Sequence, residues 1–71
     1  MTLSEALEIA LISETAGYEF YKSVRDSTDD PEIRTLAAEF VIEEAEHVSW
    51  IEKWMEEERN KSQSSETLRS D

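Results

Sequence analysis

The sequence predicts an all-α fold, an antiparallel two-helix hairpin that dimerises into a four-helix bundle. Two segments carry core-type residues at alternating gaps of four and three, which places each set on one face of a helix. The 71 residues include one glycine and one proline, which argues against a sheet with many turns. Both segments are rich in Ala, Leu, Glu, Lys and Met, which are good helix formers.

The first helix is predicted from about Ser4 to about Asp26. Ser4 is the expected N-cap, and Glu5 and Glu8 are favourable near the positive end of the helix dipole. The inner face of this helix consists of Leu3, Leu7, Ala10, Glu14, Gly17, Tyr21 and Val24.

The second helix is predicted from Pro31 to about Arg59. Asp30 is the expected N-cap, and proline is favoured as the first helical residue. The short break before it, residues 27–30, makes the two helices antiparallel neighbours. The inner face of this helix consists of Ile33, Ala37, Phe40, Glu44, His47, Ile51 and Trp54.

Composition divides the chain into a helical hairpin, residues 1–59, and a polar tail, residues 60–71. The tail is rich in serine and has Leu68 as its one large apolar residue, so we expect it to be disordered.

The net charge of −11 and the absence of cysteine limit the function classes. A strongly acidic chain is a poor partner for nucleic acid or for an anionic membrane, and it attracts cations. Without cysteine there is no disulfide and no thiolate metal site. The chain has no apolar run near the roughly 18 residues of a membrane span, and no signal peptide is expected. We therefore expect a cytoplasmic protein.

Three polar residues, Glu14, Glu44 and His47, interrupt the two inner faces. If the turn centres near Asp29, residues at one level of the hairpin have numbers that sum to about 58. Glu14 then lies level with Glu44, while Ala10 lies near His47, Tyr21 near Ala37, and Gly17 near Phe40 and Val41. Because an unpaired buried carboxylate costs several kcal/mol, a bound cation is the simplest explanation of the three polar residues.

Glu44 and His47 form a Glu-x-x-His pair, which places both side chains on one face of a helix. A carboxylate oxygen combined with an imidazole nitrogen suits iron, manganese or zinc better than calcium. Two structural alternatives remain, a core histidine bonded to Glu43 or Glu44, and a partly exposed Glu14. Glu43 lies off the inner face, so we expect it outside the ligand set.

One hairpin supplies only two glutamates and one histidine, and it leaves its apolar face open on one side. Two hairpins related by a two-fold axis supply four glutamates and two histidines around one centre. A glutamate from each of two helices and a Glu-x-x-His from each of the other two is the di-metal carboxylate site of four-helix bundles.

The two helical segments resemble half of a ferritin-like di-iron protein of the rubrerythrin kind. In "EALEIALISETAGYEFY" the family pattern places a ligand glutamate, Glu14, seven residues before the tyrosine of a Phe-Tyr pair, Phe20 and Tyr21. In "DPEIRTLAAEFVIEEAEHVSWIEKW" the family's Glu-x-x-His falls on Glu44 and His47. The resemblance implies a homodimer that holds two Fe ions, with manganese or zinc as substitutes.

The resemblance covers about residues 5–55 and also includes the encapsulated ferritins. Those two-helix proteins assemble their ferroxidase centre across a dimer and pack into larger rings, and their tails dock into an encapsulin shell. The tail "SSETLRSD" resembles such a docking peptide only faintly. The rubredoxin-type domain of true rubrerythrins is missing, because the chain has no cysteine.

Two roles are open for Tyr21. Its hydroxyl donates a hydrogen bond to a ligand carboxylate of either chain, or its side chain only packs in the core. Trp50 and Trp54 are expected to be packing residues. Apolar residues off the inner faces, such as Ile12 and Phe20, indicate assembly beyond a dimer.

We expect a ferroxidase-type activity in which Glu14, Glu44 and His47 of each chain bind two Fe(II) ions that O2 or peroxide oxidises. Two alternatives remain open. The hairpin is a non-catalytic dimerisation module that a metal stabilises, or it is half of a longer rubrerythrin-like protein.

Overall fold

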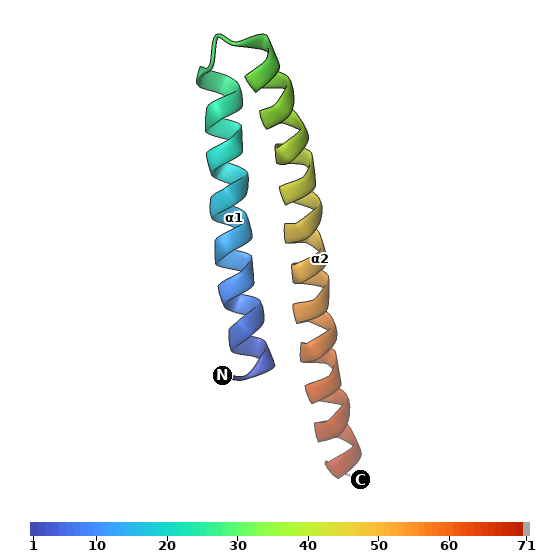
Figure 1. Cartoon of the computed structure of the whole chain (residues 1–71). Helices are drawn as coiled ribbons and strands as arrows, with labels where there is room; N and C mark the ends of the chain where they lie inside the picture. Colours follow the sequence, from blue (N-terminus) through green and yellow to red (C-terminus); the bar gives the residue numbers. More distant parts are fainter. Residues whose placement is uncertain (71) are drawn as a thin grey trace.

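The computed structural model describes the backbone of residues 1–70 and the side chains of residues 1–61. It consists of two helices, α1 (Leu3–Ser27) and α2 (Pro31–Ser70), which lie side by side and antiparallel (Figure 1). α2 extends well past the start of α1, so the molecule is a rod of 62 × 19 × 12 Å. The predicted two-helix hairpin is confirmed. No strand occurs within residues 1–70.

The start of α1 is set by a capping box between Thr2 and Glu5. The backbone N–H of Glu5 donates to Thr2 Oγ1 over 3.1 Å, and the backbone N–H of Thr2 donates to Glu5 Oε1 over 2.8 Å. The predicted cap, Ser4, is therefore wrong by two residues. The physical reason is that Thr2 has a glutamate three residues later, whereas Ser4 has Leu7 at that position.

The turn between the helices is held by side chains that bond to the backbone. Asp30 Oδ1 accepts hydrogen bonds from the backbone N–H groups of Glu32, at 2.9 Å, and Ile33, at 3.3 Å. Arg34 donates to the carbonyl oxygen of Thr28 over 2.8 Å. The predicted N-cap, Asp30, and the helix start at Pro31 are confirmed.

The end of α2 differs from the predicted one. The backbone stays helical to Ser70, whereas composition predicted an end near Arg59 and a disordered tail over residues 60–71. Residues 60–70 contain neither glycine nor proline, so no residue in this segment stops the helix. Asp71 lies outside the described residues.

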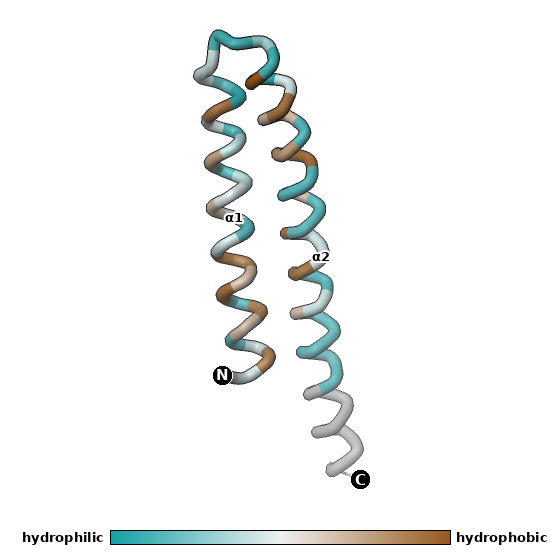
Figure 2. The backbone as a smooth tube through the Cα atoms, viewed as in Figure 1, coloured by the Kyte–Doolittle hydropathy of each residue, from teal (hydrophilic) through white to brown (hydrophobic). Residues whose placement is uncertain are grey.

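The hydrophobic core of one chain is small. Among the described side chains, four apolar residues are buried, namely Leu7, Ala37, Val41 and Ile51. All come from the facing sides of the two helices, and three of them belong to the predicted inner faces. Apolar stretches continue along both helices in Figure 2, beyond what this core uses. Neither helix, over the described residues, combines the length and the apolar character that a membrane crossing requires.

The two helices are offset from the predicted register by about one turn. Tyr21 packs on Phe40, with 4.8 Å between ring centroids, rather than at the level of Ala37. His47 lies beside Glu14 rather than beside Ala10. Helical side chains lean toward the N-terminus of their own helix, so a given level is covered by a residue about one position further along each helix. In an antiparallel pair the two shifts add, and the numbers of two touching residues sum to about two more than the Cα level predicts. This lean accounts for most of the offset.

Candidate metal centre

The three polar residues of the inner faces converge near the middle of the hairpin. Glu14 from α1 and Glu44 and His47 from α2 each offer a ligand atom, and these atoms lie within 4.8 Å of one another. Among the described residues this is the one group of three or more potential ligands that lie so close. The predicted convergence is confirmed, whereas metal binding by these residues stays a prediction.

His47 is oriented toward the carboxylate on the other helix. Its Nδ1 lies 3.5 Å from Glu14 Oε2, so the two helices are linked across the centre. The His47 side chain is 54% exposed and that of Glu14 is 32% exposed. The histidine is therefore not the buried core residue of the structural alternative, and its imidazole is open to a ligand from outside the chain.

Glu14 and Glu44 face each other across the helix pair. A hydrogen bond between the two carboxyl groups lowers the pKa of Glu14 and raises that of Glu44. Desolvation and the negative charge of Glu14 raise the pKa of Glu44 further. Because each carboxylate makes the ionisation of the other less favourable, a cation bound between them would relieve the repulsion.

Gly17 borders the carboxyl group of Glu44. A Cβ atom added at Gly17 would lie 3.2 Å from Glu44 Oε2 and 3.5 Å from its Cδ. Sequence reasoning placed Gly17 on the inner face but opposite Phe40 and Val41, so it missed this contact. The signal available in the sequence was a lone glycine three residues after Glu14.

Glu43 and Tyr21 lie near the centre without joining the ligand group. Glu43 is not part of it, as predicted, although its charge contributes to the raised pKa of Glu44. Tyr21 contacts Phe20, at 5.3 Å between centroids, as well as Phe40. These contacts agree with the packing role of Tyr21, and its hydrogen bond to a ligand carboxylate stays a prediction.

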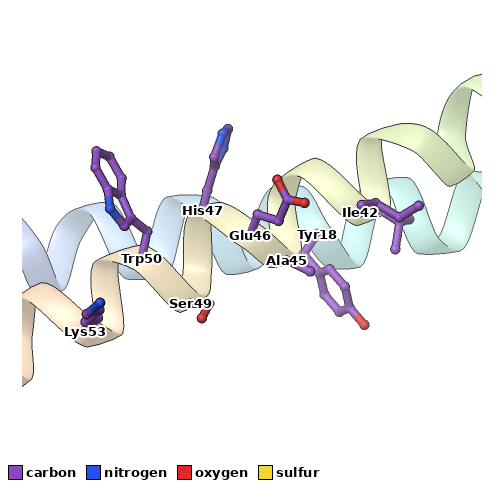
Figure 3. Close-up of a pocket in the computed structure, with 9 residues that line it drawn as sticks. Tyr18, Ile42, Ala45, Glu46, His47, Ser49, Trp50 and Lys53 are labelled. Atoms are coloured by element: carbon purple, nitrogen blue, oxygen red, sulfur yellow. The ribbon is translucent and has the colours of Figure 1, made fainter.

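His47 also forms one wall of a shallow pocket on α2. Figure 3 shows His47 and Trp50 projecting from the same side of this helix. Trp50 stacks on Trp54, with 5.1 Å between centroids and 20° between ring planes. The two indoles are 61% and 50% exposed, so within one chain they pack on each other and stay outside the core, although Trp54 was predicted on the inner face.

The residues present fit an iron, manganese or zinc ion better than calcium. Two carboxylates supply hard oxygen ligands and one imidazole supplies a borderline nitrogen. The space beside Gly17, where a Cβ would crowd the carboxylate, leaves Glu44 room to reach the centre. One chain supplies three potential ligands, whereas the di-metal sites of four-helix bundles use six.

Comparison with known proteins adds one match. The model of a protein family described as Rubrerythrin matches residues 5–70, which contain all three potential ligands. Neither the curated proteins nor the solved structures returned a match.

Proposed function

Because the chain belongs to the rubrerythrin family, we propose that it is a di-iron carboxylate protein that oxidises Fe(II) with O2 or peroxide. The observation that carries the proposal is the convergence of Glu14, Glu44 and His47 in the middle of the hairpin. Two carboxylates that face each other beside a histidine repel one another when no cation lies between them, and a cationic substrate would relieve that repulsion.

The proposed site is completed by a second copy of the chain. His47 and Glu14 are only partly covered within one chain. Leu36 precedes His47 by eleven residues and Trp54 follows it by seven, so both lie on the same side of α2 as His47, and both are half-exposed. A second hairpin packed on this side covers the apolar residues and doubles the ligand set to four glutamates and two histidines. It thereby forms a four-helix bundle.

In this proposal the protein's part in the chemistry is to hold two Fe(II) substrate ions close together. Two ions supply the two electrons that reduce O2 to H2O2, with two protons taken up, or that reduce peroxide to two molecules of water. Glu14 and Glu44 supply anionic oxygen ligands, which favour the more highly charged Fe(III) product, and His47 supplies a neutral nitrogen. No side chain acts as a nucleophile. We place this activity in the cytoplasm, with or without an encapsulin shell around it.

The first test compares Fe(II) oxidation by the native chain with that of Glu14→Ala and His47→Ala. Fe(II) is added anaerobically to metal-free protein, and O2 uptake and Fe(III) absorbance are followed after air is admitted. We expect both variants to oxidise Fe(II) no faster than buffer does, because each removes two ligands from the dimeric site.

Glu43→Ala and Glu46→Ala are matched controls, because each removes one negative charge from α2 outside the ligand group and should retain native oxidation rates. Native rates in both ligand variants would refute the proposal. Tight Fe(II) binding without O2 uptake by the native chain would support the alternative, a metal-stabilised dimerisation module.

A further inference from the structure

Gly17 is the one glycine of the chain, and it lies in the interior of α1. Glycine in a helix interior is about 1 kcal/mol less favourable than alanine. The backbone does not require it, because no glycine of the described chain has a positive φ. The reason for a glycine here is therefore the space next to its Cα.

That space faces a single side chain. The three nearest atoms to a Cβ added at Gly17 are Oε2, Cδ and Cγ of Glu44, at 3.2, 3.5 and 3.9 Å. None of them is a backbone atom of α2, so Gly17 is not explained by a close approach of the two helix backbones. A methyl group at this position would crowd the carboxylate and nothing else nearby.

We propose that Gly17 is a positioning residue that sets where the Glu44 carboxylate meets its metal ion. This inference rests on the proposed function, in which Glu44 is a ligand. A contact at 3.2 Å forces Glu44 to move by a few tenths of an ångström. Metal–ligand distances tolerate only about 0.2 Å, so the displacement matters for metal binding, whereas a helix pair absorbs it readily.

The test separates metal affinity from stability by exchanging two neighbouring residues. Ala16 precedes Gly17 and is exposed, so Ala16→Gly changes helix propensity in the same turn without changing the space at Glu44. The double variant Ala16→Gly/Gly17→Ala restores the composition but leaves the methyl group beside the carboxylate. Each protein is titrated with Co(II), and its visible absorption spectrum and metal-free thermal unfolding are recorded.

Gly17→Ala and the double variant are expected to bind Co(II) about tenfold or more weakly, with a changed spectrum, as substitutions around a ligand do. Their metal-free forms should unfold at or above the native temperature, since alanine is the better helix former. Ala16→Gly should keep the native affinity and unfold at a lower temperature.

Three outcomes would overturn the inference, and each has a different explanation. Native Co(II) affinity in Gly17→Ala would show that Glu44 does not depend on this space. Loss of the metal-free fold in Gly17→Ala would assign the glycine to helix packing. A native chain that binds neither Co(II) nor Fe(II) would refute the proposed function itself.

Discussion

At the scale of single residues, the fold shifts the pKa values of Glu14 and Glu44 in opposite directions although they are the same amino acid. The folded chain lowers the pKa of Glu14, so its contribution to stability is present above the unfolded pKa and is lost as the pH falls through the folded value. The folded chain raises the pKa of Glu44. The contribution of Glu44 to stability is therefore present below its unfolded pKa and is lost as the pH rises through its folded value. The raised pKa of Glu44 therefore reflects an unfavourable ionisation beside Glu14, which the metal-free chain bears as the pH rises.

Glu44→Gln should stabilise the metal-free chain at neutral pH. The amide replaces the protonated carboxyl group, so it can donate a hydrogen bond to Glu14 without adding a charge. The unfolding temperature should rise at pH 7, and the rise should shrink as the pH falls below the pKa of Glu44. The same variant should lose most of its Fe(II) affinity.

Thermal unfolding between pH 4 and pH 8 checks this expectation, with Glu46→Gln as the control that removes a charge outside the ligand group. An unfolding temperature that falls at pH 7 in Glu44→Gln would contradict the repulsive pair.

At the scale of helices, the ends of α1 and α2 depend on individual caps. Thr2 and Glu5 satisfy each other's backbone N–H groups at the start of α1. Asp30 does the same for two N–H groups at the start of α2. Because the turn between the helices is short, the cap at Asp30 also determines how α2 leaves α1, and so how Glu44 and His47 reach Glu14.

Asp30→Ala should destabilise the hairpin by about 1 kcal/mol, the usual effect of removing an N-cap. For a chain of this size the loss corresponds to a fall of about 4–8 °C in the unfolding temperature. Asp29→Ala is the matched control, since it removes the same charge from the same turn but not the cap. Equal losses in the two variants would show that charge, rather than capping, is responsible.

At the scale of the whole molecule, one hairpin leaves more large apolar side chains exposed than it buries. Ten large apolar side chains of the described residues are exposed, against four buried apolar residues. The most exposed within the helices are Ile12, at 71%, and Phe20, at 62%; Ile42 and Trp50 are each 61% exposed. Under the proposed function, the second copy covers the exposed apolar residues near His47, and those off the inner faces, such as Ile12 and Phe20, are available for assembly beyond a dimer.

Dimerisation should strengthen with salt and with divalent metal. Each chain carries a net charge of −11, so two metal-free copies repel each other at low ionic strength. Sedimentation analysis should show the dimer dissociation constant falling by about tenfold or more between 10 mM and 500 mM NaCl, as the repulsion is screened. Fe(II) added anaerobically at low salt should have a similar effect.

His47→Ala should retain the salt dependence and lose most of the metal dependence, because it removes a ligand but no permanent charge. A native chain that stays monomeric under all these conditions would contradict the shared site.

The sequence alone predicted the two helices, the cap at Asp30 and the convergence of Glu14, Glu44 and His47. Helical periodicity and turn chemistry are local properties, and a carboxylate or histidine on an apolar face stands out without coordinates. The sequence did not predict the cap at Thr2, the helical backbone beyond Arg59 or the level at which the two helices touch. Only the tertiary structure placed Gly17 against Glu44 and His47 against Glu14. Such contacts depend on how the two helices lie against each other, and packing between elements, rather than any local property of the sequence, sets that arrangement.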